Sequence, residues 1–334
     1  MTRAAVFGSG SWGTTFAQVL CDAGGEVRLW GRRPEVVDAV NARHENAEHL
    51  PGTRLPDALR ATTDPAEAAD GAAIVVFAVP SQSLRENLEK WSAVLPRDAV
   101  LVSLMKGIEL GTCKRMSEVV QDVTGAGPER VAVVSGPNLA REIAARQPAA
   151  TVVASAAEET ATAVQDACHT AYLRTYTGTD VVGAEVCGAT KNVIALAVGI
   201  SVGLGFGDNT RSMLITRGLA ESVRLGTALG ADIQTFAGLA GVGDLAATCG
   251  SPLSRNRTFG ERLGRGESFA DVVADTREVA EGVKSCRSIL ELARRNGVEL
   301  PITEAVVGVV HGGVPPRDAV RSLMSRSAKP EWYG

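Results

Sequence analysis

A glycine cluster near the N-terminus is the feature that most constrains the fold of this 334-residue chain. In the stretch AAVFGSGSWGTTFAQVL, four apolar residues precede Gly8, Gly10 and Gly13, and a helical pattern follows. A second apolar run, EVRLW (26–30), comes at the distance expected of a βαβ unit. In that setting the glycines allow a tight turn, a close approach of the backbone to a pyrophosphate, and packing of the helix on the sheet. Backbone N–H groups at the helix N-terminus would bind the phosphates. The sequence therefore predicts a dinucleotide site.

Side chains around this turn bear on the identity of the dinucleotide. Ser11 and Trp12 lie on the turn and could contact it, although Trp12 fits a core position nearly as well. The second strand usually ends in an acidic residue that binds the ribose hydroxyls of NAD, but this chain has Arg32 and Arg33 there, about 20 residues beyond the glycines. Two guanidiniums slightly favour the 2′-phosphate of NADP over NAD without excluding NAD. The alternative is a solvated surface pair.

The first half of the chain alternates short apolar runs with helical patterns. Near-continuous Val, Ile and Ala runs of this kind predict a doubly wound, mainly parallel sheet covered on both faces, which is an α/β Rossmann domain over residues 1–180. The predicted strands are 4–7, 26–30, 72–79, 99–104, 131–135, 150–155 and 173–177.

Long amphipathic patterns replace the strand pattern after about residue 180. They predict an all-α domain over 181–334, and the cleft between the two domains is the expected site. The predicted helices are near 183–200, 211–230, 257–264, 281–296, 302–311 and 316–326.

Composition excludes several classes of protein. The formal charge is −4 and Lys and Arg are scattered, so no basic face for nucleic acid or anionic lipid is expected. The longest apolar segment (193–207) is interrupted by glycines and is too short for a membrane span, so we expect a buried helix and a loop. The N-terminus lacks a signal pattern, the six cysteines form no C-x-x-C, and the four histidines form no H-x-x-x-H. We expect a cytoplasmic protein with reduced thiols and no metal.

Two polar segments follow predicted strands of the first half. Lys106 comes directly after AVLVSLM, at the carboxyl end of a strand, where ligands bind in open α/β sheets. The segment SGPNLA ends the strand at 131–135, and its Gly136, Asn138 and Ala140 could offer backbone or amide contacts. An ordinary turn is the alternative for SGPNLA.

Buried charges are expected in the second half. Lys191 and Asn192 lie in GATKNVIALAVG, a helix of small and apolar residues. Burial should lower the pKa of the Lys191 amine and suit it to proton transfer, whereas snorkelling to the surface is the alternative. Asp244, in AGVGDLAATC, is a lone carboxylate that needs a cation, and Lys191 is the predicted partner.

Donors gather before a later helical pattern. In PLSRNRTFGERLG, the residues Ser254, Arg255 and Asn256 offer hydroxyl, guanidinium and amide groups beside a helix N-terminus, which would suit a phosphate. A charged surface turn is the alternative. Val279 and Glu281, in VAEGVKS, lie in a predicted loop, where Glu281 could be a simple helix-terminal charge.

Taken together, these segments resemble the bacterial NAD(P)-dependent glycerol-3-phosphate dehydrogenases. The resemblance runs in order from residue 4 to about residue 310, and the KNVIA, LITRGLAE, GDL and SRNR blocks are far more specific than the glycine motif. The matching stretches are GSGSWGT, LWGRRPE, VPSQSLRE, KGIE, SGPNLAREIA, GATKNVIALA, GDNTRSMLITRGLAE, AGVGDLAATC, SRNRTFGERLG, VAEGV and LPITEAV.

The resemblance implies reversible reduction of dihydroxyacetone phosphate to sn-glycerol 3-phosphate for phospholipid synthesis, a small phosphorylated substrate and a homodimer. It implies that Lys191 is the proton acceptor for the substrate hydroxyl, assisted by Lys106 and Asp244. Implied substrate contacts are Lys106, Gly136, Asn138, Lys191, Asn192, Asp244, Thr248, Ser254, Arg255 and Asn256. Implied cofactor contacts, besides the three glycines, are Ser11, Trp12, Arg32, Arg33, Lys106, Ala140, Arg255, Val279 and Glu281.

Several positions depart from the usual pattern of that family. Cys187 replaces a glycine, Thr190 precedes the lysine, Asn138 replaces Ser or Thr, and His49 occupies a typically aromatic position. None of these changes removes a charged catalytic group, but they leave open a paralogue acting on a related phosphate or phosphonate ketone. A β-hydroxyacid-type dehydrogenase and a non-catalytic dinucleotide sensor are the competing interpretations.

Overall fold

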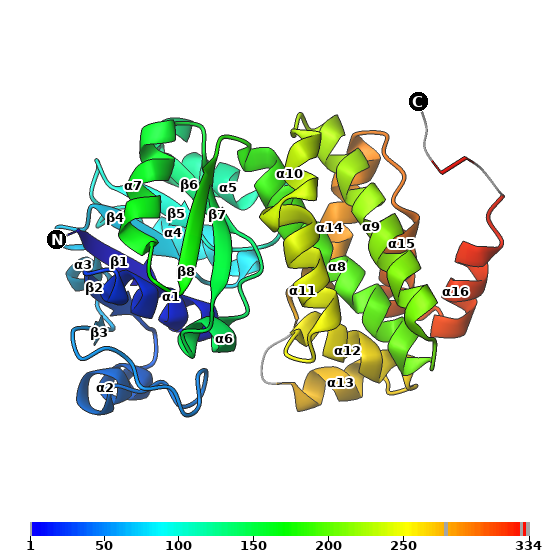
Figure 1. The fold of residues 1–334 in the computed structure, drawn as a ribbon, viewed down its shortest axis with the longest axis horizontal. Helices are drawn as coiled ribbons and strands as arrows, with labels where there is room; N and C mark the ends of the chain where they lie inside the picture. The colour runs from blue at the N-terminus through cyan, green and yellow to red at the C-terminus, as the bar shows by residue number, and fades with distance from the viewer. Residues whose placement is uncertain (1, 277–279, 328–329, 332–334) are drawn as a thin grey trace.

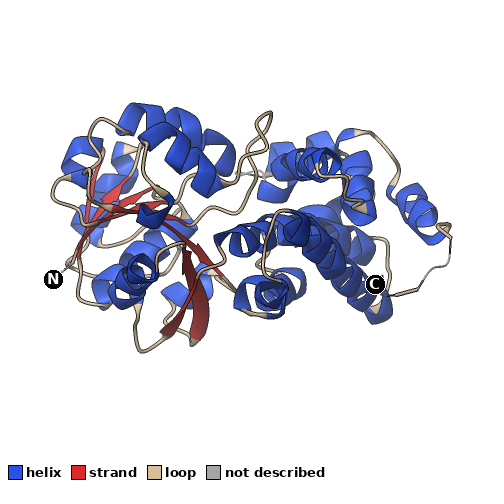
Figure 2. Cartoon of the chain, turned by 90° about the horizontal axis from the view of Figure 1, so that it is seen from above, coloured by secondary structure: helices blue, strands red, loops and turns tan. Residues whose placement is uncertain are grey.

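The computed structural model describes residues 2–276, 280–327, 330 and 331. An eight-stranded sheet with helices on both faces stands beside a bundle of helices (Figures 1 and 2). We refer to residues 2–178 as the sheet half and to the described residues from 181 onward as the helical half. The predicted fold class, a Rossmann sheet followed by an all-α region, is confirmed. Domain boundaries at 1–180 and 181–334 stay a prediction.

The sheet has the order β3-β2-β1-β4-β5-β6-β7-β8. Neighbouring strands are parallel except β6 and β7, which are antiparallel. The connection between those two strands holds one short helix, and a parallel crossover ordinarily contains a longer one. The strands are β1 (Arg3–Phe7), β2 (Glu26–Trp30), β3 (Arg60–Thr62), β4 (Ile74–Phe77), β5 (Val100–Ser103), β6 (Val131–Ser135), β7 (Ala149–Ser155) and β8 (Leu173–Gly178). Only β3 was not predicted, because its three residues carry no apolar run.

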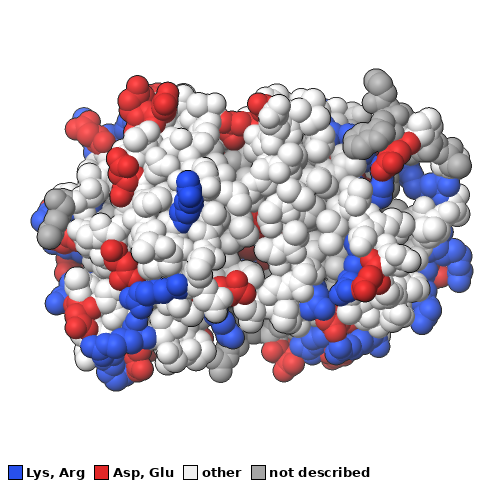
Figure 3. Space-filling model, viewed as in Figure 1, with Lys and Arg blue, Asp and Glu red and all other residues white. Residues whose placement is uncertain are grey.

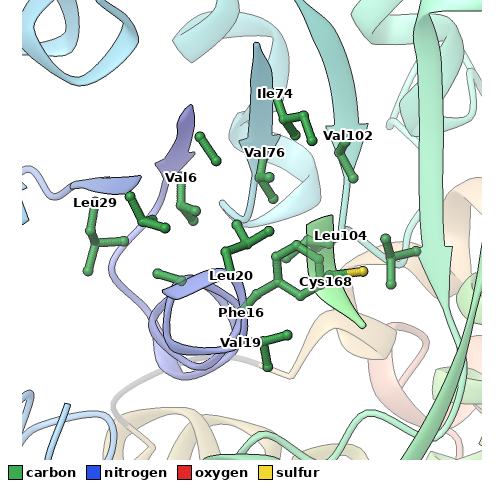
Figure 4. Close-up of a cluster of buried hydrophobic side chains, with 14 of the residues drawn as sticks. Val6, Phe16, Val19, Leu20, Leu29, Ile74, Val76, Val102, Leu104 and Cys168 are labelled. Carbon is green, nitrogen blue, oxygen red and sulfur yellow. The ribbon is translucent and has the colours of Figure 1, made fainter. Parts of the chain in front are cut away.

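Side chains of each central strand alternate between two buried cores. Val6 of β1 packs with Phe16 and Leu20 of helix α1 on one face, as Figure 4 shows, whereas Phe7 packs with Trp91 of helix α4 on the other. Burial on both faces explains why the strands read as continuous apolar runs. The helices of the sheet half are α1 (Ser11–Asp22), α2 (Pro34–Arg43), α3 (Pro65–Ala69), α4 (Leu84–Trp91), α5 (Met116–Thr124), α6 (Ala140–Ala144) and α7 (Glu158–Cys168).

Helix α8 (Val181–Gly203) is the centre of the helical half. It is long and apolar enough to span a membrane by composition alone, but 83% of its most apolar window is buried inside the protein, so it is a core helix. A Cβ on Gly199 would lie 2.0 Å from the Arg257 carbonyl oxygen, so the glycines of α8 let another helix approach its backbone. The remaining helices are α9 (Asp208–Ala228), α10 (Ile233–Ala237), α11 (Asp244–Gly250), α12 (Arg255–Gly264), α13 (Phe269–Asp275), α14 (Glu281–Arg295), α15 (Pro301–His311) and α16 (Pro316–Met324).

Short helices were the main omission of the sequence-based prediction in this half. Helices α10, α11 and α13 have seven residues or fewer, too few for a helical period to appear.

Charged side chains of both signs lie next to one another around the margin of the face shown in Figure 3, and the middle of that face is largely uncharged.

Candidate active site

The glycine turn between β1 and α1 is shaped for a ligand. Gly8 has φ +126°, and a Cβ there would lie 2.4 Å from the Ala78 carbonyl oxygen. A Cβ on Gly13 would lie 1.9 Å from the Gly8 carbonyl oxygen, whereas one on Gly10 would meet no atom within 4 Å. Gly8 and Gly13 are therefore required by packing, and the space beside Gly10 is open for a phosphate.

The start of α1 supplies donors at that space. Its N-cap is Gly10, and no side chain in the described part of the chain caps the first-turn N–H groups. The Trp12 indole Nε1 is buried without a hydrogen-bond partner among the described residues. Free N–H donors at a helix N-terminus, together with an orphaned buried donor, fit a dinucleotide bound along this turn.

The segment between α2 and β3 lies on the same turn, which sequence reasoning did not anticipate. The buried Asn46 amide donates to the Ser9 carbonyl at 2.8 Å and to the Thr14 hydroxyl at 2.9 Å. The Ser11 hydroxyl donates to the His49 carbonyl at 3.0 Å. This segment has no hydrophobic period, so only its contacts reveal that it forms a wall beside the glycine turn.

Of the two arginines that follow β2, Arg33 contacts this wall. Arg32 is exposed, and Arg33 is half-buried as the N-cap residue of α2. The Arg33 guanidinium binds both carboxylate oxygens of Glu48, at 2.9 and 2.7 Å. The predicted position for recognising a 2′-phosphate is therefore occupied by an arginine that already pairs with an acid.

A buried ion cluster lies where the two halves meet. Asp244, at the start of α11, accepts hydrogen bonds from Lys191 of α8 through Oδ1 and from Lys106 of the sheet half through Oδ2, the latter at 2.5 Å. The Lys191 amine also donates to the Thr248 hydroxyl at 2.8 Å. Asp244 is 1% exposed and Lys191 is 8% exposed. The two cations predicted from separate sequence segments thus share one carboxylate.

Burial changes the acidity of the central lysine. It lowers the pKa of the Lys191 amine to about 7, chiefly through desolvation, and the positive charge of Lys106 lowers it further. The Asp244 carboxylate opposes both effects. An amine with a pKa near neutrality can both accept and donate a proton at physiological pH.

The amides near the cluster bind one another. Asn192 donates to the Lys106 carbonyl at 3.3 Å, and Asn256 donates to the Asn192 side-chain oxygen at 2.9 Å. The Asn256 side-chain oxygen accepts from the Gly282 N–H at 2.9 Å. These residues hold the Lys106 loop, α8, α12 and the start of α14 in one arrangement. Ser254 caps α12, and Arg255 is exposed in its first turn.

The loop after β6 completes the surroundings of Lys106. The Lys106 amine donates to the Gly136 carbonyl at 2.9 Å, and Gly136 has φ +152°. The Asn138 amide donates to the Thr151 hydroxyl at 3.1 Å, whereas its side-chain oxygen is buried without a partner among the described residues. Thr151 had not been predicted in the site.

Two further predicted cofactor residues, Ala140 and Glu281, lie at separate places. Ala140 begins α6, and its carbonyl accepts from Thr15 of α1 at 3.2 Å, which sets it beside the glycine turn. Glu281 begins α14 and accepts from the Ser81 hydroxyl at 2.6 Å, a link between the halves that sequence reasoning missed. Val279 lies outside the described residues. Among the described residues, no group of three His, Cys, Asp or Glu side chains could hold a metal.

Comparison with known proteins matches the sequence and the fold of this chain to a family. The model of the NAD-dependent glycerol-3-phosphate dehydrogenase N-terminus matches residues 3–161, and the model of its C-terminus matches residues 180–321. The glycerol-3-phosphate dehydrogenase [NAD(P)+] of Streptomyces avermitilis is 64% identical over 98% of both chains, and that of Thermobifida fusca is 62% identical over the full length of both. The crystal structure of glycerol-3-phosphate dehydrogenase from Coxiella burnetii has a TM-score of 0.93 at 35% identity, covering 97% of this chain and 99% of that one.

Proposed function

Because the chain belongs to the NAD-dependent glycerol-3-phosphate dehydrogenase family, we propose that Lys191, with Asp244 and Lys106, performs the proton transfer of that reaction. The enzyme reversibly reduces dihydroxyacetone phosphate to sn-glycerol 3-phosphate with NADH or NADPH. The observation that carries the proposed roles is the buried cluster in which Asp244 binds both lysine amines.

The cluster accounts for both directions of proton transfer. The bound nicotinamide supplies or accepts the hydride. In reduction, protonated Lys191 donates to the oxygen that becomes the secondary hydroxyl; in oxidation, neutral Lys191 removes the proton from that hydroxyl. Lys106 adds positive charge that stabilises the alkoxide, and Asp244 holds both amines in place.

Binding roles follow from the surrounding donors. Arg255, Asn256 and Ser254 would hold the substrate phosphate at the start of α12, and Gly136, Asn138, Asn192 and Thr248 would enclose the reacting end. The cofactor would lie along Gly8, Gly10, Ser11, Trp12 and Gly13, with Arg32 and Arg33 at its adenosine ribose and with Lys106, Ala140, Arg255 and Glu281 along the cleft. We also propose two domains divided near residue 180, a homodimer, a cytoplasmic location and a role in phospholipid synthesis.

Steady-state oxidation of NADH and NADPH by the purified protein with dihydroxyacetone phosphate tests the function. We expect turnover with both cofactors, and a kcat/KM on the order of 100-fold lower for dihydroxyacetone, which lacks the phosphate that Arg255 would bind. Higher activity on a β-keto acid, or on another phosphate or phosphonate ketone, would contradict the assigned substrate. Binding of NADPH without turnover of any ketone would instead favour a dinucleotide sensor.

The pH dependence of the two directions should have opposite signs. Since the pKa of Lys191 is about 7 in the free protein, kcat/KM for glycerol 3-phosphate oxidation should rise as the pH approaches 7 and level off above it. For dihydroxyacetone phosphate reduction it should be constant below pH 7 and fall above it, because the protonated amine is then lost. Profiles measured in both directions, with the cofactor saturating, check this. Profiles that fall on the same side in both directions would exclude Lys191 as the shared acid and base.

A further inference from the structure

We propose that Glu48 sets the preference between NADP and NAD by competing with a 2′-phosphate for Arg33. The inference rests on the proposed NAD(P) site and assigns a specificity role to a residue outside the glycine turn and outside the second strand.

The outer edge of the Arg33 guanidinium binds the carboxylate of Glu48. Its Nη1 and Nη2 lie 2.9 and 2.7 Å from the Glu48 Oε1 and Oε2, a bidentate arrangement. Its Nη2 also lies 3.2 Å from the His49 Nε2, and its Nε lies 3.8 Å from a Glu35 oxygen. The Arg33 and Glu48 side chains are 34% and 35% exposed, so solvent screens this pair only in part.

The backbone on both sides of Glu48 is held against the glycine turn. Two residues before it, buried Asn46 binds the Ser9 carbonyl and the Thr14 hydroxyl; one residue after it, the His49 carbonyl accepts from Ser11. The end of β2 is fixed on the same turn, since a Cβ on Gly31 would lie 2.8 Å from the Ser9 hydroxyl oxygen. Arg33 and Glu48 are therefore both placed by the turn that would bind the pyrophosphate.

This arrangement has opposite consequences for the two cofactors. A ribose 2′-hydroxyl can donate to a carboxylate, as it does to the acid that usually ends the second strand of NAD-binding sheets. A 2′-phosphate carries nearly two negative charges. To reach Arg33 it would have to displace the Glu48 carboxylate or approach that carboxylate against electrostatic repulsion. The acidic residue that usually follows the second strand is replaced by Arg32 in this chain. Glu48 thus supplies that carboxylate from another segment.

Calorimetric titration with adenosine 2′,5′-bisphosphate and with 5′-AMP, followed by steady-state kinetics with NADPH and NADH, tests the role of Glu48. In Glu48→Gln we expect the ratio of bisphosphate to AMP affinity to rise about tenfold, because the Arg33 guanidinium then binds the 2′-phosphate without first giving up a carboxylate, a charge-assisted contact in partly screened solvent. The ratio of kcat/KM for NADPH to that for NADH should rise in parallel. In Arg33→Ala the same substitution should have a much smaller effect, since Glu48 then has no guanidinium to occupy.

The matched control is Glu45→Gln, which removes one charge from the same segment but from a carboxylate that pairs with Arg43. Its affinity ratio should stay within twofold of the wild type. An unchanged or lower ratio in Glu48→Gln would overturn the inference, and a lower ratio would mean that Glu48 orients Arg33 toward the phosphate. If neither fragment binds the wild type, the proposed cofactor site itself fails, and the inference with it.

Discussion

Replacing Lys191 with alanine should lower kcat for dihydroxyacetone phosphate reduction by about 10³- to 10⁴-fold, the upper range for loss of a general acid. The amine is buried with its pKa near 7, and Asp244 and Thr248 aim it, so water entering the space would be neither as acidic nor as well placed. NADPH affinity, measured by quenching of tryptophan fluorescence, should change by no more than about twofold, because the glycine turn is untouched.

Lys191→Arg separates acid catalysis from charge. Arginine keeps the positive charge beside Asp244 but does not release its proton near neutral pH, so we expect it to be nearly as inactive as alanine. Lys90→Ala, at an exposed lysine paired with Glu86 on α4, is the control and should retain wild-type kinetics. Near-normal turnover in Lys191→Ala would show that another group transfers the proton. Activity in Lys191→Arg alone would assign the residue an electrostatic role.

Asp244→Asn should have the second largest effect. The amide keeps the shape of the side chain but leaves the Lys191 and Lys106 amines without their shared anion. Removing one partner of a buried ion pair costs about 3 kcal/mol of stability, and we expect kcat to fall by about 10²- to 10³-fold as the lysines lose their positions. Chemical denaturation measures the first effect and steady-state kinetics the second.

A pH profile distinguishes this role from simple destabilisation. The Asp244 carboxylate raises the pKa of Lys191, so its removal should lower that pKa and shift the rising limb of glycerol 3-phosphate oxidation below pH 7. Thr248→Val, which removes a neutral hydroxyl bonded to the same amine, should leave the limb within about half a pH unit of the wild type. If the rising limb of the oxidation profile stays at the same pH in Asp244→Asn, the carboxylate does not control the pKa of Lys191.

Local pattern was sufficient to predict most of the fold. The apolar runs become strands because both faces of the sheet are covered, and the glycine spacing survives because Gly8 and Gly13 have no room for a side chain. Short elements such as β3 and α13 contain too few repeats of their period to be recognised from the sequence. The strand β7 was predicted, but its antiparallel pairing with β6 was not. The direction of a strand depends on its connection and not on its own residues.

Apart from the glycine turn, contacts within the site were predictable only where burial forces a partner. A lysine and an aspartate in apolar segments each require a countercharge, which is why Lys191 and Asp244 could be paired from the sequence. The contacts of Asn46 with the glycine turn and of Glu281 with Ser81 join residues whose types are ordinary for loops and helix ends. Nothing in their local sequence distinguishes such residues from solvated ones, so their role depends on tertiary structure alone.

Asp244 and Lys191 both belong to the helical half, whereas Lys106 comes from the sheet half. Any hinge motion that parts the halves would withdraw Lys106 from the cluster and admit water to it. Both changes raise the pKa of Lys191, since the nearby positive charge and the desolvation are what lower it. An open cleft would thus hold the lysine protonated and unable to act as a base, and closure would make it ready to exchange its proton. The acidity of one side chain would report whether the cleft is shut.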